Sequence, residues 1–407
     1  MDISRRAITI QESPIRKLAP LAAAARERGT EIYHLNIGQP DVVTPPEFLR
    51  AIAEFKDSVL AYGPSDGLPE LRQAMVDYFA RFSIALEPHD LLVTNGGSEA
   101  ILFAFNVVAD EGEEIIIPEP FYTNYNGYAE MANLKVIPVR TRAEDGFHLP
   151  ADDALDAAVT PRTRAILVCS PNNPTGTVLT SEELDRLAAY VKRHKIFLIA
   201  DEVYKEFTYD GRRHRSVLEL PGIEDQVIVV DSISKRFSAC GARVGAVISR
   251  NREVMASVLK FGQARLCPPT LEQLGAVAAY HLPETYFDHV RGEYQKRRDV
   301  MYAGLTRDAG IILKKPRGAF YMIVKISDMD DADDFARWLL EDFALDGETV
   351  MVAPAAGFYA SPGAGRDEVR MAYVLDAAKL ERAIEVFLTG LKRYRALHSP
   401  LLVSLAH

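Results

Sequence analysis

Residues 227–245 read VIVVDSISKRFSACGARVG, and this stretch decides the fold. The β-branched run from Val227 to Val230 predicts a strand that is buried on both faces of a sheet. Polar residues follow at its carboxyl end, where open α/β sheets bind their ligands. Lys235 is one of these polar residues, and we interpret it as the covalent anchor of a cofactor.

Two other apolar runs also end in polar side chains. AILVCSPNNPTG at residues 165–176 brings Asn173, and IFLIADEVY at residues 196–204 brings Asp201 and Tyr204. Because the carboxyl ends of parallel strands lie along one edge of a sheet, these side chains are expected to converge on one pocket. The pattern predicts an α/β fold with a mostly parallel central sheet flanked by helices.

These residue types meet the needs of pyridoxal 5'-phosphate. The cofactor requires a lysine for its Schiff base and an acidic partner for its ring nitrogen. Asp201 could keep the pyridine nitrogen protonated, since an opposite charge at close range favours the ionised form of each group. Tyr204 and Asn173 carry donors that could stabilise the phenolate oxygen of the ring. The strand ends therefore predict pyridoxal 5'-phosphate as the cofactor.

A second constellation could hold the phosphate of the cofactor. LLVTNGGSEAILFAFNVV at residues 91–108 predicts a short strand, a glycine turn and an apolar helix. The exposed amides near Gly97 and Ser98, where this helix starts, would form an anion site. Arg243 adds a guanidinium suited to phosphate oxygens, and Ser232 adds a hydroxyl. Together these groups predict a cradle for a dianion.

With these motifs the chain resembles, over nearly its whole length, the class I/II aminotransferases, which are fold-type I pyridoxal-phosphate enzymes of the aspartate aminotransferase superfamily. The family pattern of Ser-x-[Ser/Ala]-Lys with a later Gly-x-Arg-x-Gly is matched within residues 232–245, and Asn-Pro-[Thr/Gly]-Gly is matched by residues 173–176. The resemblance implies catalytic roles for Lys235, Asp201 and Tyr204. It also implies cofactor contacts for Gly97, Ser98, Glu99, Tyr122, Asn173, Asp201, Tyr204, Ser232, Ser234, Lys235 and Arg243.

The resemblance further implies contacts with the substrate. In EVRMAY, residues 368–373, Arg370 corresponds to the arginine that binds the α-carboxylate of the amino acid. A planar guanidinium can hold a carboxylate through two hydrogen bonds and so fix the Cα–H bond against the ring. In LNIGQPD, residues 35–41, Gly38 is expected to approach the same carboxylate, with Asn173 also in contact with the substrate.

Two aromatic residues complete the site that the resemblance implies. In PFYTNY, Tyr122 is expected to stack on the ring of the cofactor. In YGPSDGLPELR, Tyr62 is expected to reach the phosphate bound by the neighbouring subunit. The resemblance therefore implies an obligate homodimer with shared sites.

The implied activity is that of an aminotransferase, or transaminase, of amino acid metabolism. It would move an amino group between an L-amino acid and a 2-oxo acid in ping-pong half-reactions through the Lys235 Schiff base. The expected substrate is of the aspartate/glutamate type or broad. Relatives that act on aspartate often carry a lysine where this chain has Ser98, so Arg16 and Arg265 are alternative candidates for binding a distal carboxylate.

Two other interpretations stay open at this stage. The same fold and residues serve carbon–sulfur β-lyases and enzymes of specialised pathways, and a lyase would release pyruvate and ammonia without a 2-oxo acid acceptor. Related domains also act as ligand sensors in transcription regulators. The stretch before LNIGQPD is too short for a helix-turn-helix module, which disfavours that interpretation.

Composition agrees with a small-molecule enzyme. The chain has 407 residues, of which 48% are hydrophobic, so two domains are expected. A net charge of −10 argues against nucleic acid as a partner. The 3 cysteines are widely spaced and suggest neither a disulfide framework nor a metal site. No apolar run approaches the length of a membrane span, and the N-terminal stretch lacks the apolar region of a signal peptide, so a cytoplasmic location is expected.

The chain divides into two predicted domains. Residues 41–289 are expected to form a large cofactor-binding domain, and residues 1–40 and 290–407 a discontinuous, smaller α+β domain. Within this division the apolar patterns predict helices at residues 17–28 and 285–306 and strands at residues 319–326 and 349–354.

Overall fold

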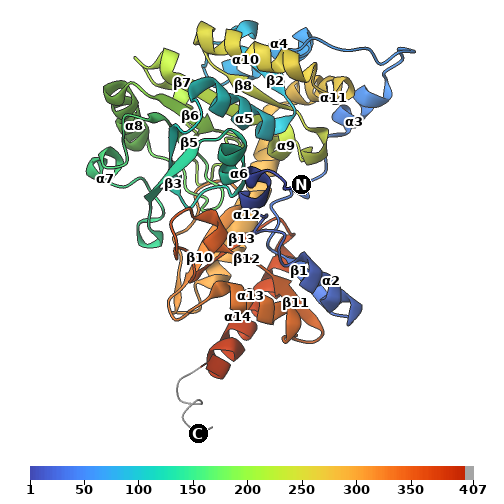
Figure 1. The fold of residues 1–407 in the computed structure, drawn as a ribbon. Helices are drawn as coiled ribbons and strands as arrows, with labels where there is room; N and C mark the ends of the chain where they lie inside the picture. The colour runs from blue at the N-terminus through green and yellow to red at the C-terminus, as the bar shows by residue number, and fades with distance from the viewer. Residues whose placement is uncertain (399–407) are drawn as a thin grey trace.

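In the computed structural model, which describes residues 1–398, a broad α/β layer lies above a smaller α+β layer (Figure 1). The upper layer is built on a sheet whose strand order is β2-β8-β7-β6-β5-β3-β4. Its strands are β2 (Leu91–Thr94), β3 (Glu114–Glu119), β4 (Lys135–Arg140), β5 (Thr163–Cys169), β6 (Phe197–Asp201), β7 (Val227–Ser232) and β8 (Gly245–Ile248). Strand β8 is antiparallel to both of its neighbours, and the pairs from β7 to β4 are parallel. The predicted mostly parallel sheet is confirmed.

Strand β7 is buried on both faces, as its β-branched run predicts. Ile228 and Val230 face one apolar cluster, while Val227 and Val229 face another. The first cluster is covered by α5 (Gly96–Val108), α6 (Asn124–Met131) and α10 (Arg252–Arg265). The second is covered by α3 (Pro46–Ala53), α4 (Pro69–Ala80), α7 (Asp152–Asp156), α8 (Ser181–His194) and α11 (Thr270–Tyr280). Helices on both faces fix the strands, and with them the sheet edge that carries the polar residues.

The smaller layer contains a second, antiparallel sheet in the order β12-β13-β10-β9. Its strands are β9 (Ile311–Ile312), β10 (Tyr321–Ile326), β12 (Ala353–Pro354) and β13 (Glu368–Ala372). The helices α2 (Ala19–Glu27), α13 (Ala332–Glu341) and α14 (Ala377–His398) belong to this layer. The predicted helix at residues 17–28 and the predicted strand at residues 319–326 are confirmed by α2 and β10.

The strand expected at residues 349–354 is divided between two sheets. Strand β11 (Glu348–Met351) pairs in parallel with β1 (Glu31–His34), whereas β12 pairs with β13. The chain changes sheets at Val352, which lies between β11 and β12. The apolar pattern continues through the change because both short strands are buried.

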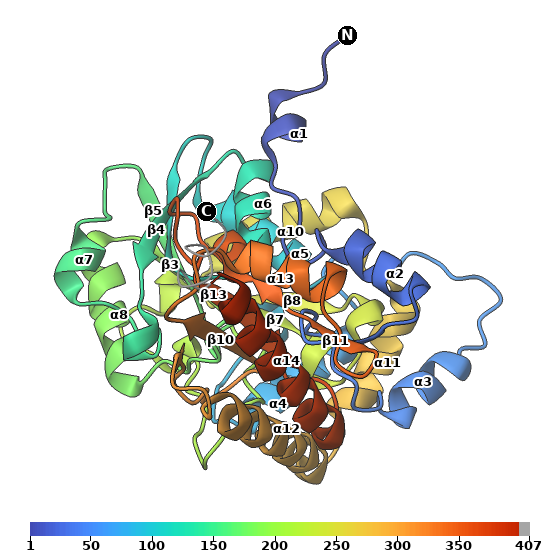
Figure 2. The same ribbon diagram turned by 90° about the horizontal axis from the view of Figure 1, so that it is seen from below.

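One long helix runs along both layers. Helix α12 (Glu284–Leu305) confirms the helix predicted at residues 285–306, and it packs beside α14 (Figure 2). Near the N-terminus, the short helix α1 (Arg5–Thr9) projects from the body of the molecule, and its last residue, Thr9, donates a hydrogen bond to Glu130 of α6 at 2.6 Å (Figure 2). Within residues 1–398, no helix has the length and apolar character needed to span a bilayer.

Candidate active site

A cavity of about 570 Å³ lies at the carboxyl edge of the central sheet, where the two layers meet. Its volume is within the range of small-molecule sites. The polar residues that follow β2, β5, β6 and β7 converge on it, as expected for parallel strand ends. Of the residues predicted from the sequence, it is lined by Gly38, Gly97, Ser98, Tyr122, Asn173, Asp201, Tyr204, Ser232, Ser234, Lys235, Arg243 and Arg370.

Lys235 enters the cavity from the one-turn helix α9 (Ile233–Arg236), which directly follows β7. The Ser232 hydroxyl caps this turn by accepting a hydrogen bond from the Ser234 amide at 3.2 Å. The Lys235 Nζ donates to the carbonyl of Gly38 at 2.9 Å. Gly38 can come this close because it lacks a Cβ, which would overlap the ring of Tyr321. The amine is thus held in the cavity by the segment that follows β1.

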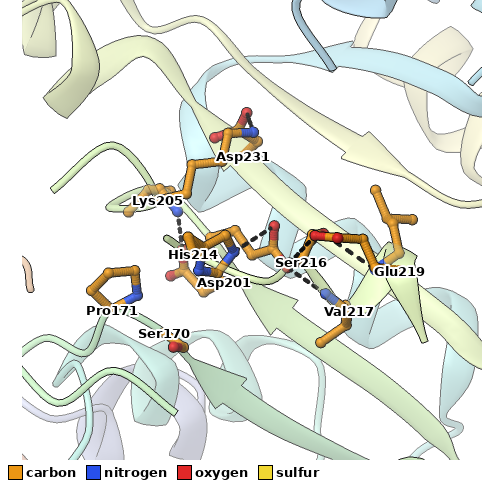
Figure 3. A network of polar contacts seen from close by, with 12 residues as sticks. Ser170, Pro171, Asp201, Lys205, His214, Ser216, Val217, Glu219 and Asp231 are labelled. Atoms are coloured by element: carbon orange, nitrogen blue, oxygen red, sulfur yellow. Dashed lines mark hydrogen bonds and ion pairs between the residues drawn. The ribbon is translucent and has the colours of Figure 1, made fainter. Parts of the chain in front are cut away.

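The turn that carries Lys235 is anchored by a buried ionic cluster, of which Figure 3 shows Lys205 and Asp231. The Asp231 carboxylate accepts hydrogen bonds from the Ser232 amide at 2.8 Å, from Lys205 Nζ at 2.9 Å and from Arg236 at 2.8 Å and 2.9 Å. Burial alone would raise the pKa of Asp231, but Arg236 and Lys205 outweigh it and hold the pKa below its ordinary value. Asp231 therefore stays ionised and clamps both ends of the turn.

A second buried network fixes the chain just after β6 (Figure 3). Glu202 accepts hydrogen bonds from the Ser216 hydroxyl and from the Val217 amide, both at 2.9 Å. His214 Nε2 lies 3.1 Å from the other carboxylate oxygen of Glu202. Glu202 follows Asp201 in the chain, so this network holds the position from which Asp201 enters the cavity.

Asp201 lies deep in the cavity with a hydroxyl as its strongest partner. The Tyr125 hydroxyl donates to Asp201 Oδ2 at 2.7 Å, and the Val203 amide donates to Oδ1 at 3.3 Å. Burial raises the pKa of Asp201 to about 6, against these two hydrogen bonds. A cationic group beside this carboxyl would stabilise its ionised form, and a protonated pyridine nitrogen is such a group.

Within residues 1–398, Arg370 is a buried cation without an acidic partner. Its side chain, only 1% exposed, donates to Asn173 Oδ1 at 3.1 Å and to the carbonyl of Asn36. The rings of Tyr321 and Phe358 lie 4.7 Å and 4.8 Å from the guanidinium carbon. Within residues 1–398 its Nε has no hydrogen-bond partner and the guanidinium forms no ion pair. Burial lowers the pKa of Arg370, so a bound carboxylate would relieve a desolvated charge.

The start of α5 and Arg243 form the expected cradle for a dianion. Gly96 adopts a φ of +77°, and a Cβ there would overlap the Arg243 guanidinium. Arg243 donates to the carbonyls of Cys240 at 2.9 Å and of Asn95 at 3.3 Å, which directs it toward the free amides of the helix start. Gly97, Ser98 and Ser232 line the cavity beside it, so the set fits a phosphate.

Two predicted residues lie outside this cavity. Glu99 accepts a hydrogen bond from the Asn95 amide at 2.8 Å and pairs with Arg265 at 3.3 Å, so its carboxylate is engaged by the protein and does not line the cavity. Tyr62 is 81% exposed, on the connection between α3 and α4 that projects from the body of the molecule. Roles for Glu99 and Tyr62 stay predictions, and for Tyr62 the role requires a second subunit.

The two candidate arginines for a distal carboxylate lie in different places. Arg16 lines the cavity, and its side chain forms no ion pair within residues 1–398. Arg265 instead donates to the carbonyl of Val93 at 2.9 Å and pairs with Glu99. In a single subunit, therefore, Arg16 can meet a bound ligand, and Arg265 is already partnered.

Two tyrosines in the site escaped the sequence interpretation. Tyr125 lies in the same PFYTNY motif as Tyr122, three positions after it, and this motif was a usable signal. Tyr321 lies in the apolar strand β10 and gave no signal, yet its hydroxyl is 3.0 Å from that of Tyr204. Pairing with Tyr321 orients the Tyr204 hydroxyl in the cavity.

The chain is similar to known proteins over most of its length. The family model described as "Aminotransferase class I and II" matches residues 30–387. The aspartate aminotransferase of Bacillus subtilis is 30% identical, with 98% of this chain and 100% of that protein covered. The aspartate/prephenate aminotransferase of Thermus thermophilus is also 30% identical, with 96% and 99% covered.

Solved structures of such proteins superpose on the fold. A Thermus thermophilus aspartate aminotransferase determined with maleate gives a TM-score of 0.85 at 30% identity and covers 96% of this chain and 100% of that one. An alanine aminotransferase from Pyrococcus furiosus gives a TM-score of 0.87 at 30% identity, with the same coverage.

Tyr125→Phe tests whether the hydroxyl keeps Asp201 ionised. Loss of this donor should raise the pKa of Asp201 further above about 6. The variant should then bind pyridoxal phosphate more weakly than the wild type at pH 6, and the ratio of the two dissociation constants should shrink at pH 8.5, where both carboxyls are ionised. Because both proteins bind the same cofactor at the same pH, the titration of the cofactor affects both dissociation constants equally and drops out of their ratio. A ratio that is the same at both pH values would contradict this role.

Proposed function

The chain belongs to the class I and II aminotransferase family and is a pyridoxal-phosphate-dependent aminotransferase; from this premise we propose that its residues transfer the amino group of an acidic amino acid. The observation that carries the proposal is the charge pattern of the cavity. Arg16, Lys235, Arg243 and Arg370 line it, and within residues 1–398 Asp201 is its one acidic residue. A ligand with several negative charges matches this set.

We assign the proton transfers to Lys235. When bound, the cofactor supplies a conjugated ring that withdraws electrons from the substrate Cα. Lys235 holds the cofactor covalently between turnovers, and once its amine is free, Nζ can accept the Cα proton and would deliver it to the cofactor carbon that receives the amino group. The hydrogen bond to the Gly38 carbonyl supports this assignment, because it keeps Nζ inside the cavity.

Asp201, Tyr204 and Asn173 are proposed to hold the ring of the cofactor. Asp201 would face the protonated nitrogen, and Tyr204 would donate to the phenolate oxygen. The partners of these side chains support the roles. Tyr125 favours the charged form of Asp201, and Tyr321 orients the Tyr204 hydroxyl.

Arg370 is proposed to bind the α-carboxylate of both substrates. An amino acid and a 2-oxo acid carry the same carboxylate, so one guanidinium can orient each of them in turn. A single cavity can therefore serve the two ping-pong half-reactions. Gly38 and Asn173 flank this position, since Asn173 contacts Arg370 and Gly38 contacts Lys235.

Arg16 is proposed to bind the distal carboxylate of aspartate or glutamate. Arg243 is occupied by the phosphate in this scheme, Arg370 by the α-carboxylate and Lys235 by the cofactor and the proton transfers, which leaves Arg16 as the remaining cation of the lining. Asn36 links the two substrate arginines, because its carbonyl accepts from Arg370 and its amide group donates to the Ile15 carbonyl at 3.2 Å. Asn36 would thus fix the positions of the two arginines that bind the two carboxylate groups of the substrate.

We further propose a homodimer in which Tyr62 completes the neighbouring phosphate site. Val59 and Leu60 are 70% and 58% exposed beside Tyr62, and Leu266 is 53% exposed. Such apolar exposure is typical of a surface that a partner covers.

The division into a large domain, residues 41–289, and a small one, residues 1–40 and 290–407, is likewise proposed, although residues 399–407 lie outside the described part of the chain. The cytoplasmic location stays a prediction.

Lys235→Ala should abolish the visible absorbance of the lysine-bound cofactor and also turnover. In the wild type, borohydride reduction should fix the cofactor to a peptide that contains Lys235, as mass spectrometry can show. Lys260→Ala, at an exposed lysine outside the cavity, is the control and should behave as the wild type. Persistence of both the absorbance band and turnover in Lys235→Ala would refute the assignment.

Arg16→Gln should change substrate preference rather than general activity. The kcat/KM for aspartate and glutamate should fall by about tenfold or more relative to that for alanine, since the distal carboxylate loses its charged partner. Lys17→Gln is a matched control, because Lys17 pairs with Asp333 and lies outside the cavity. If Arg265→Gln shifts the ratio and Arg16→Gln does not, the distal carboxylate belongs to Arg265.

Tyr62→Ala should weaken cofactor binding even though the side chain is exposed in a single subunit. The physical reason is the loss of a phosphate contact across the dimer interface. Sedimentation should give a dimer for the wild type and for the variant, while the dissociation constant of the cofactor rises. A fully active monomer, or an unchanged dissociation constant, would rule out the shared site.

A further inference from the structure

A second cavity, of about 470 Å³, lies between the turn after β5 and the segment that joins β9 to β10. Its walls come from residues 143–148, residues 175–180, Arg212 and residues 312–317. None of its lining residues lines the active-site cavity. The reaction proposed above gives it no role.

The lining of this cavity is strongly basic. Arg212, Lys314, Lys315 and Arg317 line it, and among residues 1–398 Asp145 supplies the one carboxylate of the lining. That carboxylate lies 3.7 Å from Arg142 Nε, and a single carboxylate leaves the lining with a net positive charge. The whole chain has a net charge of −10, whereas the lining of this cavity has a net positive charge.

Two of the four cations have acidic partners and two do not. Lys315 pairs with Asp299 at 2.8 Å, and Arg317 pairs with Asp210. Arg212 and Lys314 form no ion pair and no side-chain hydrogen bond within residues 1–398. Their charges are therefore available to a ligand, while the paired cations add to the local potential.

The walls of the cavity are fixed to one another before any ligand binds. The Gly176 carbonyl accepts hydrogen bonds from the amides of Arg317 at 3.0 Å and Gly318 at 2.9 Å. The Thr177 hydroxyl donates to the carbonyl of Gly146 at 2.7 Å. These contacts join the wall segments from the large and small layers, so the cations are presented on a preformed frame.

We propose that this basic cavity is a second binding site, for a small ligand with several negative charges on oxygen, such as a phosphate ester or a polycarboxylate. Arg212 supplies a planar fork suited to paired oxygens, and Lys314 supplies a compact charge. The volume suits a small ligand.

An occupant would bridge segments that also serve the active site. Thr175 donates to Asn172 Oδ1 through both its amide and its hydroxyl at 3.0 Å, and Asn173 follows directly. The opposite wall continues from Arg317 to Tyr321, which contacts Tyr204. Because the bridged frame exists only in the folded protein, the ligand should stabilise the native state.

The test uses the holoenzyme, so that the phosphate cradle of the active site is filled. Inorganic pyrophosphate and citrate are titrated separately at constant ionic strength, with Tm and calorimetric binding as the two measurements. The variant is R212Q/K314Q, which removes both unpaired cations. The matched control is R5Q/K392Q, which has the same change in charge at two exposed residues that line neither cavity.

We expect saturable binding at one site per chain that raises Tm, with the affinity at least about tenfold weaker in R212Q/K314Q and unchanged in the control. Pyrophosphate alone would identify a phosphate ligand, citrate alone a polycarboxylate, and both a general polyanion site. The proposal is overturned if neither probe binds saturably to the wild type, or if R212Q/K314Q binds as tightly as the control. The single variant K314Q, at an exposed side chain, repeats the test if the double variant does not fold.

Discussion

Asp231 is buried between Lys205 and Arg236, and it also accepts a hydrogen bond from the Ser232 amide. This interaction spans the turn from β7 into α9, on which Ser232, Ser234 and Lys235 lie. Removing one member of a buried ion pair typically costs about 3–5 kcal/mol, because the remaining charge is left uncompensated. The turn is therefore fixed by ion pairs outside the cavity. The side chain of Lys235 is not needed to hold the turn, so its amine can react. The position of the amine relative to Asp201 and Arg243 follows from this clamp.

The sequence patterns predicted the strand ends well because each is a local signal. An apolar run followed by polar residues identifies a buried strand and its carboxyl end, and parallel packing then brings those ends together, as Asn173, Asp201 and Lys235 show. Tyr321 could not be found this way. It lies in an apolar strand and looks like ordinary core, and its role depends on Tyr204, which is far away in the sequence. The division of residues 349–354 between two sheets was missed for a related reason, since both short strands are buried and only their partners differ.

Other features lie beyond any single-chain pattern. The expected role of Tyr62 requires a second subunit, since the side chain is exposed on a projecting loop. The difference between Arg16 and Arg265 also depends on tertiary contacts. The sequence alone does not distinguish the two arginines. In the structure, Arg265 is bound by Glu99 and by the Val93 carbonyl, whereas the Arg16 side chain has no ion pair or hydrogen bond within the described residues. Partner side chains, rather than residue type, decide which cation can receive a ligand.

The same criterion separates the arginines that build the fold from those that bind ligands. Arg236 and Arg298 are fully buried, and each is paired with a carboxylate, Asp231 or Asp210. Arg370 is as deeply buried, but in the described part of the chain its hydrogen-bond acceptors are an amide and a carbonyl oxygen, and two aromatic rings lie beside it. A desolvated cation in such surroundings destabilises the empty protein and strengthens the attraction for an incoming carboxylate, because the ligand then supplies the missing charge. Arg370 thus lowers the stability of the empty protein and raises its affinity for a carboxylate ligand. The buried ion pairs of Arg236 and Arg298 carry no such cost, because each arginine has its own carboxylate.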